Sequence, residues 1–213
     1  KLGDMYKKKQ DFDKAVAEDR KALTKNDRLW PVYFDLAELL MSSNQAEEAD
    51  RLFRRVVRAS GDEELVARAA RLSLQIHLGT GTLELLEREL LPVAVGNPQK
   101  PVYRRLLVEL YGVMTLPLVQ RVRHSESAEK VAAGRAELTK IGSRAIKPLL
   151  DALADDREKQ QRVAIEILSY VENRNAGPTL LNFAMTSKDR ELGVRAMVAL
   201  GALADPGMLG KLE

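Results

Sequence analysis

Cysteine is absent from the 213 residues, so the chain can form neither disulfides nor thiolate metal sites. Aromatic residues make up only 5% of the sequence, and alternating runs of β-branched residues, which would indicate strands, are few. Leu, Ala, Glu, Arg and Lys are abundant instead, and all five favour helices. The composition therefore predicts an all-α protein and leaves its redox compartment open.

Long apolar runs are also missing. No run approaches the roughly 18 residues that a membrane span needs, and the first residues lack the apolar core of a signal peptide. Charge is nearly balanced, with 34 Lys and Arg against 31 Asp and Glu, and a net charge of +3 does not indicate nucleic acid as a partner. We expect a soluble protein, in the cytoplasm in preference to other compartments.

The first half of the chain repeats itself. Sliding the sequence by 34 residues aligns small and apolar positions with one another, and a third copy follows more weakly. A unit of this length with such positions is typical of a helical hairpin, which buries its apolar face only when copies stack. The aligned pairs are Leu2 with Leu36, Tyr6 with Leu40, Ala15 with Ala49, Ala22 with Val56, and Asp27 with Gly61.

The second unit, residues 28–61, has the clearest pattern. A polar stretch at residues 43–45 predicts the turn between its two helices. The predicted buried stripes are Tyr33, Leu36, Ala37 and Leu40 on the first helix, and Ala49, Phe53 and Val56 on the second.

These positions resemble the tetratricopeptide repeat (TPR), in which a large residue and Leu-Gly or Leu-Ala on one helix are followed by Ala, Phe and Ala on the next. Residues 1–27 match less completely, because Asp19 and Asp27 replace the usual aromatic residue and proline. The third unit is looser, with a break at "LGTGT" (78–82). A fourth hairpin is expected from residue 97, with a further short helix after Pro117.

A second kind of repeat begins at residue 125. Ser127 is the predicted N-cap of a helix, and proline occurs in the first turn of two later helices. An Asp followed six residues later by Arg occurs twice, and this pattern resembles HEAT repeats of short length. The positions that correspond to the family's Pro, Asp and Arg are Pro148, Asp156 and Arg162, and again Pro178, Asp189 and Arg195.

Motifs for chemistry are sparse. His77 and His124 have no second ligand at helical spacing, and a surface or turn role is expected for both. "GTGT" at 79–82 lacks the strand and the spacing of a phosphate-binding loop, and the paired acidic residues fit solvated surfaces and helix caps. We expect no enzyme activity, no catalytic residue, no metal and no cofactor.

Arg51, Arg54, Arg55 and Arg58 form a basic stripe along one helix. Acidic residues lie close by, and no aromatic residues alternate with the arginines to stack on bases. A salt-bridged, solvated surface is therefore favoured over a nucleic-acid site.

The TPR resemblance implies a concave groove lined by the first helix of each hairpin. An aromatic residue, a flexible methionine and charges of both signs in that groove suit a peptide or helix with apolar anchors. The implied groove residues are Asp4, Lys7 and Lys8 of the first unit, Phe34, Glu38 and Met41 of the second, and Arg68, Leu72 and Gln75 of the third.

These observations predict a right-handed α-solenoid, a superhelix of TPR-like hairpins over residues 1–124 and HEAT-like hairpins over 125–213. The expected function is a non-catalytic protein-protein interaction scaffold that binds a partner segment in the groove. The alternatives are a regulatory or docking arm of a larger multidomain protein and, less favoured, a nucleic-acid-binding repeat. Both ends of the chain cut through a motif, so we expect a segment of a longer chain or assembly.

Overall fold

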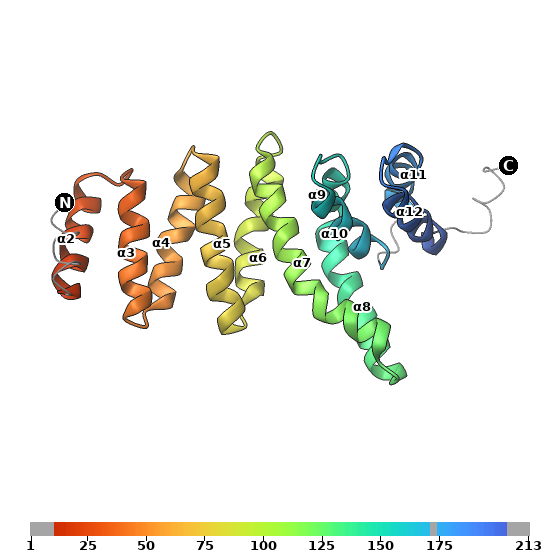
Figure 1. The fold of residues 1–213 in the computed structure, drawn as a ribbon, viewed down its shortest axis with the longest axis horizontal. Coiled ribbons are helices and arrows are strands. Elements are labelled where there is room, and N and C mark those ends of the chain that lie inside the picture. Colours follow the sequence, from red (N-terminus) through yellow and green to blue (C-terminus); the bar gives the residue numbers. More distant parts are fainter. Residues whose placement is uncertain (1–10, 171–173, 204–213) are drawn as a thin grey trace. The chain divides into compact units, whose positions relative to one another are not determined.

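The computed structural model describes residues 11–170 and 174–203. Within these residues there are eleven α-helices, one short 3₁₀ helix and no strand, so the all-α prediction is confirmed (Figure 1). The elements are α2 (Phe12–Lys25), α3 (Trp30–Ser42), α4 (Ala46–Ala59), α5 (Glu63–Thr80), α6 (Leu83–Gly96), α7 (Pro101–His124), α8 (Ala128–Arg144), α9 (Ile146–Ala152), α10 (Glu158–Leu168), the 3₁₀ helix η1 (Arg174–Ala176), α11 (Gly177–Thr186) and α12 (Arg190–Leu203).

The chain divides into two compact units, Lys1–Glu89 and Leu90–Glu213, and the division falls within α6. In the first unit, α2 packs against α3, α3 against α4 and α4 against α5. In the second unit, α7 packs against α8, α9 and α10, while α12 packs against α10 and α11.

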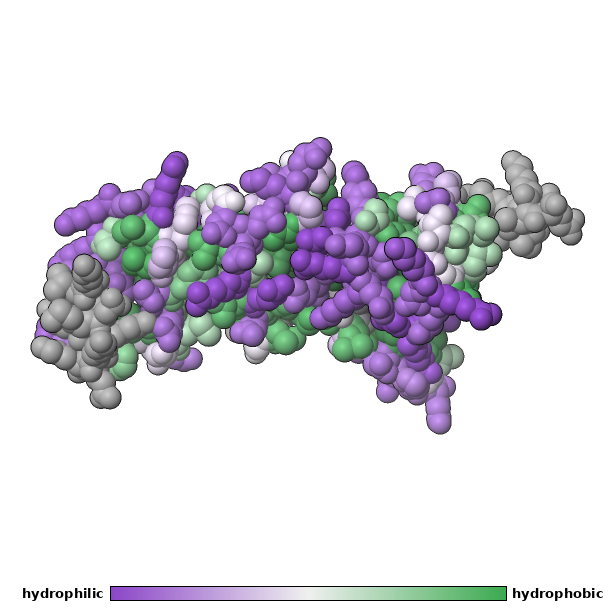
Figure 2. All heavy atoms as spheres, turned by 45° about the horizontal axis from the view of Figure 1, so that its top comes forward, coloured by the Kyte–Doolittle hydropathy of each residue, from purple (hydrophilic) through white to green (hydrophobic). Residues whose placement is uncertain are grey.

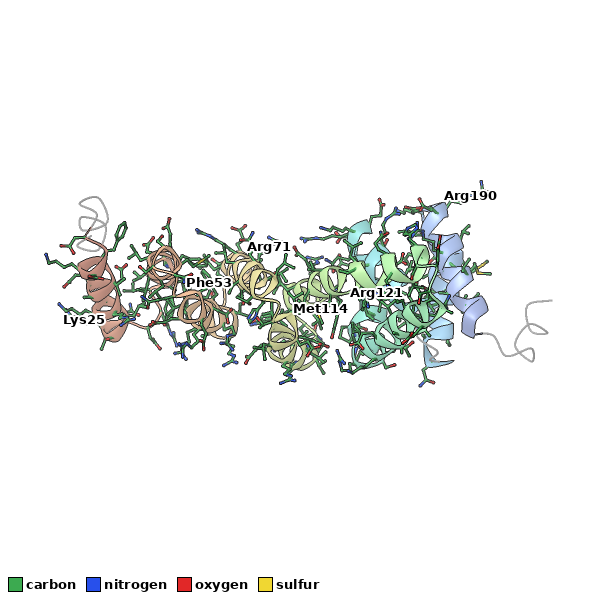
Figure 3. All side chains as sticks on the ribbon, turned by 90° about the horizontal axis from the view of Figure 1, so that it is seen from below. Lys25, Phe53, Arg71, Met114, Arg121 and Arg190 are labelled. Carbon is green, nitrogen blue, oxygen red and sulfur yellow. The ribbon has the colours of Figure 1, made fainter. Side chains whose placement is uncertain are left out.

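The core of the first unit follows the predicted stripes. Every residue of both stripes is buried, from Tyr33 on α3 to Val56 on α4. Phe53 lies among the helix ribbons in Figure 3 and its ring is 5.9 Å from that of Phe34. The predicted turn is also confirmed, because α3 ends at Ser42 and α4 begins at Ala46. Asn44 has φ of 59° there, a left-handed conformation that Asn tolerates better than most residues.

The ends of α5 are set by two residues. The Asp62 carboxylate accepts hydrogen bonds from the backbone N–H groups of Glu64 and Leu65, which lack partners within the helix. Gly81 ends the helix with φ of 69°, where a side chain would be strained. The glycine-rich stretch is therefore a helix terminus, in agreement with the predicted break.

In the second unit, the predicted helix-start signals at Ser127, Pro148 and Pro178 lie at the starts of helices. The Ser127 hydroxyl accepts a hydrogen bond from the N–H of Lys130 and caps α8. Pro148 and Pro178 lie in the first turns of α9 and α11, where a missing N–H has little cost. Leu149 of α9 and Leu153, which directly follows this helix, are buried.

The prediction that a separate short helix follows Pro117 was wrong. Helix α7 runs from Pro101 to His124 through this proline, and it changes direction along its length in Figure 1. Buried residues continue on both sides of the proline, with Thr115 before it and Val119 after it. Packing against α8 and α10 compensates for the backbone hydrogen bond that proline cannot donate.

Candidate functional site

The predicted groove residues of the second and third hairpins lie on α3 and α5. These helices are parallel, because each is joined to the antiparallel α4 by a three-residue connection. On each helix the predicted residues follow a spacing of four and then three, so they form one ridge. The guanidinium carbon of Arg68 lies 4.4 Å from the centroid of the Phe34 ring and brings the two ridges together. Asp4, Lys7 and Lys8 lie outside the described residues.

Phe34 is more enclosed than the groove prediction assumes. Only 7% of the residue is exposed, with Phe53 on one side and Arg68 above the ring. A buried ring cannot be an open anchor for a partner. Its role is to position Arg68, whose charge is attracted to the negative face of the ring.

The rest of the two ridges is accessible. Met41 is 42% exposed, Glu38, Arg68 and Gln75 are exposed, and Leu72 is half-buried between them. We call this surface, made of Phe34, Glu38, Met41, Arg68, Leu72 and Gln75, the α3/α5 face. Charged and apolar residues also interleave elsewhere on the protein, as the view in Figure 2 shows.

A buried polar cluster links α4 to α5. The Asp50 carboxylate accepts a short hydrogen bond from the Ser73 hydroxyl, and Arg54 Nε lies 2.9 Å from Asp50 Oδ2. His77 Nε2 lies 3.2 Å from the same oxygen, while His77 Nδ1 is 2.8 Å from Thr82 Oγ1. The predicted surface or turn role of His77 was therefore wrong, because this histidine is buried against a carboxylate.

The order of carboxylate, imidazole and hydroxyl in Asp50, His77 and Thr82 is that of a hydrolase triad. Here, however, the carboxylate also holds Ser73 and Arg54. None of these side chains lines the cleft between α2 and α4 or the cleft between α7, α10 and α12. The cluster instead ties α4 to α5 and to the turn before α6. Asp50 could have been suspected from the sequence, because it lies three and seven residues before Phe53 and Val57 on the buried side of α4.

A second charged cluster joins α7 to the turn after α9. The side chain of Asp155 is fully buried, with Arg104 Nη2 and Arg105 Nε at 2.9 and 2.8 Å from Oδ2. Burial raises the pKa of this carboxyl, but the hydrogen bonds from Arg105 and Arg104 outweigh it, so the pKa is well below its usual range. Asp155 is therefore ionised at neutral pH and fixes the turn to α7.

Asp156 and Arg162, the first pair at the HEAT-like spacing, form no ion pair with each other within the described residues. The Asp156 side chain is 86% exposed and contacts Arg105, whereas Asp155 caps the turn by accepting from the N–H of Arg157. Arg162 reaches α12 instead, where Glu191 and Asp189 lie 3.3 and 3.7 Å away. The spacing of six residues selects Asp156, whereas the packing buries Asp155, which lies seven residues before Arg162.

Two clefts accompany these clusters. The first, in unit Lys1–Glu89, has a volume of about 730 Å³ and is lined by Arg20, Leu23, Tyr33, Glu48, Arg51, Leu52 and Arg55. The second, in unit Leu90–Glu213, has a volume of about 220 Å³ and lies between α7, α10 and α12. Its arginines are all paired, since Arg123 and Arg195 contact Glu166, and Arg162 contacts Glu158 and Glu191.

The basic stripe on α4 is largely salt-bridged, as expected. Arg54 pairs with Asp50, Arg55 with Asp27, and Arg58 with Glu89. Arg51 has no ion pair among the described residues. Only Asp50 lies on α4, whereas Asp27 lies in the connection before α3 and Glu89 lies on α6.

In the part of the chain that the structure describes, no group of three metal-ligating side chains comes together, and no helix is both long and apolar enough to cross a bilayer. A comparison with models of known protein families and a search of curated proteins gave no match to this chain.

Proposed function

We propose that this chain is a non-catalytic protein-protein interaction scaffold, built as an α-solenoid of TPR-like and then HEAT-like hairpins. The partner is a polypeptide segment that binds the α3/α5 face. The resemblance of residues 1–61 to tetratricopeptide repeats implies this surface, and the packing of α2 to α5 in sequence order is compatible with stacked hairpins.

The observation that carries the proposal is the contact between Phe34 and Arg68. Because the buried ring holds the guanidinium, the exposed Arg68 loses little side-chain entropy when it pairs with a partner. Met41 lies two turns further along α3 and supplies a flexible apolar contact. A partner segment fits Arg68 and Met41 when its acidic group and its apolar side chain are separated by about the length of two helical turns, as Phe34 and Met41 are on α3.

Substitution of Arg68 by glutamate tests the proposal. Arg68→Glu reverses the charge and removes the stack on Phe34, which contributes about 0.5–1 kcal/mol at an exposed site. We expect the variant to recover the partner at least roughly tenfold less well in a pull-down from a lysate of the cells in which the protein naturally occurs. The reason is that a charge-assisted hydrogen bond contributes about 1.5–3 kcal/mol.

Arg88→Glu is the matched control, because Arg88 is exposed, lies on α6 and has no ion pair among the described residues. Thermal unfolding checks that both variants fold. Phe34→Ala is unsuitable, because it would create a cavity in the core. If wild-type protein, Arg68→Glu and Arg88→Glu recovered equal amounts of the partner, the partner would not bind the α3/α5 face.

A further inference from the structure

The first cleft lies on a different side of the hairpins from the α3/α5 face. Arg20 and Leu23 come from α2, and Glu48, Arg51, Leu52 and Arg55 come from α4. Tyr33 of α3 lies between these helices, and its hydroxyl donates to the Asp27 carbonyl at 3.0 Å. The cleft is therefore formed by the second helices of two consecutive hairpins, whereas the α3/α5 face is formed by first helices.

The lining of the cleft is positively charged. Three arginines contribute to it, against the single carboxylate of Glu48. Arg20 pairs with Glu48 at 2.6 Å and Arg55 pairs with Asp27 at 2.9 Å, but Arg51 has no ion pair within the described residues. One guanidinium in the cleft is thus available to an incoming anion without breaking any contact.

The two existing ion pairs present little obstacle to a ligand. About half of the Arg20 and Arg55 side chains is exposed, at 52% and 54%. Pairs at this level of exposure are screened by water and stabilise a protein by less than about 1 kcal/mol. Both arginines can therefore turn towards a new carboxylate at small cost.

The cleft also contains apolar surface. Leu23 and Leu52 are half-buried beside the arginines, and the Tyr33 ring is buried beneath them. A ligand that combines carboxylates with an aliphatic side chain satisfies both parts of the lining. Nucleic acid suits it less well, because the cleft has no exposed aromatic ring for base stacking and Glu48 repels phosphates.

We infer that the cleft between α2 and α4 is a second binding surface, and that it takes an acidic peptide segment carrying leucine-like side chains. Arg51 is the main contact for a carboxylate of this peptide, with Arg20 and Arg55 beside it. The second cleft differs, because each of its arginines already forms an ion pair, whereas Arg51 has none within the described residues.

A synthetic peptide provides the probe. A fluorescent peptide of four Glu-Glu-Leu repeats is titrated with the full chain, and anisotropy is measured at about 50 mM and about 500 mM salt, where screening differs strongly. We expect binding that weakens at high salt, and a dissociation constant roughly tenfold or more higher for Arg51→Glu. Arg51→Ala, which preserves the helix, should show a smaller loss in the same direction.

Two controls separate this inference from the proposed function. Arg68→Glu and Arg88→Glu should bind the peptide as the wild type does, whereas Arg68→Glu alone should lose the partner of the α3/α5 face. A peptide of Gln-Gln-Leu repeats should not bind. The inference is overturned if the acidic peptide does not bind wild-type protein, if Arg51→Glu binds it equally well, or if a single-stranded oligonucleotide binds this cleft more tightly.

Discussion

Adjacent residues of the same type differ in burial in this protein. Asp155 and Asp156 are neighbours of the same type, yet one side chain is fully buried between two arginines and the other is 86% exposed. The sequence pattern selected Asp156 by its spacing to Arg162, but spacing carries no information about which of two neighbouring carboxylates is buried. The choice follows from the direction in which α7 presents Arg104 and Arg105.

Asp155→Asn is expected to lower the free energy of unfolding by about 3 kcal/mol at neutral pH, since it leaves two arginines facing a neutral amide in a buried site. Asp156→Asn should change it by less than about 0.5 kcal/mol, as for other exposed positions. Urea unfolding of the two variants gives the comparison. Similar losses of unfolding free energy in the two variants would contradict the burial of Asp155 and the exposure of Asp156.

The contribution of Asp155 to the free energy of unfolding depends on pH. The native pKa of Asp155 is lowered, whereas its unfolded value is about 3.9, so the ionised carboxylate stabilises the folded state. This contribution is complete above about pH 5 and is lost as the pH falls below about 4. The difference in unfolding free energy between wild type and Asp155→Asn should therefore shrink between about pH 5 and pH 2. A difference that stayed constant would argue against the Asp155 ion pairs as its cause.

Helices and turns were the most predictable parts of the protein. The hairpin of α3 and α4 was predicted closely, because its small and apolar residues repeat at the spacing of a buried stripe. Helix α7 was not, because Pro117 is a strong local stop signal that packing on both sides overrides. Long-range packing of this kind leaves no mark in a short window of sequence.

The contact between α4 and α5 depends on Asp50 at its centre. Asp50→Asn removes the charge that holds Arg54 and His77, and we expect a loss of about 3 kcal/mol in unfolding free energy. Asp27→Asn is the matched control, since Asp27 is 64% exposed and its pair with Arg55 contributes less than about 1 kcal/mol. Chemical denaturation measures both variants, and hydrogen exchange should show faster opening of α5 in Asp50→Asn alone. Equal behaviour of the two would mean that the cluster does not hold these helices together.

The whole molecule presents two chemically distinct surfaces on unit Lys1–Glu89. The α3/α5 face offers Arg68 and Met41, and the cleft between α2 and α4 offers Arg51 beside two leucines. The sequence predicted the first through its family resemblance, although it treated Phe34 as an open anchor. It named Arg51 and Arg55 only as part of a solvated basic stripe, because spacing within α4 does not show that α2 lies beside these arginines.

Site-specific crosslinking tests the central proposal most directly. A photoreactive amino acid replaces Met41 on the α3/α5 face or, as the control, Lys25, which is exposed near the end of α2 (Figure 3). Both variants are irradiated in producing cells, and the adducts are identified by mass spectrometry. We predict a discrete protein adduct from position 41 that disappears when Arg68→Glu is added, and none from position 25. The same adducts from both positions, or an adduct at position 41 that persists with Arg68→Glu, would contradict the proposal.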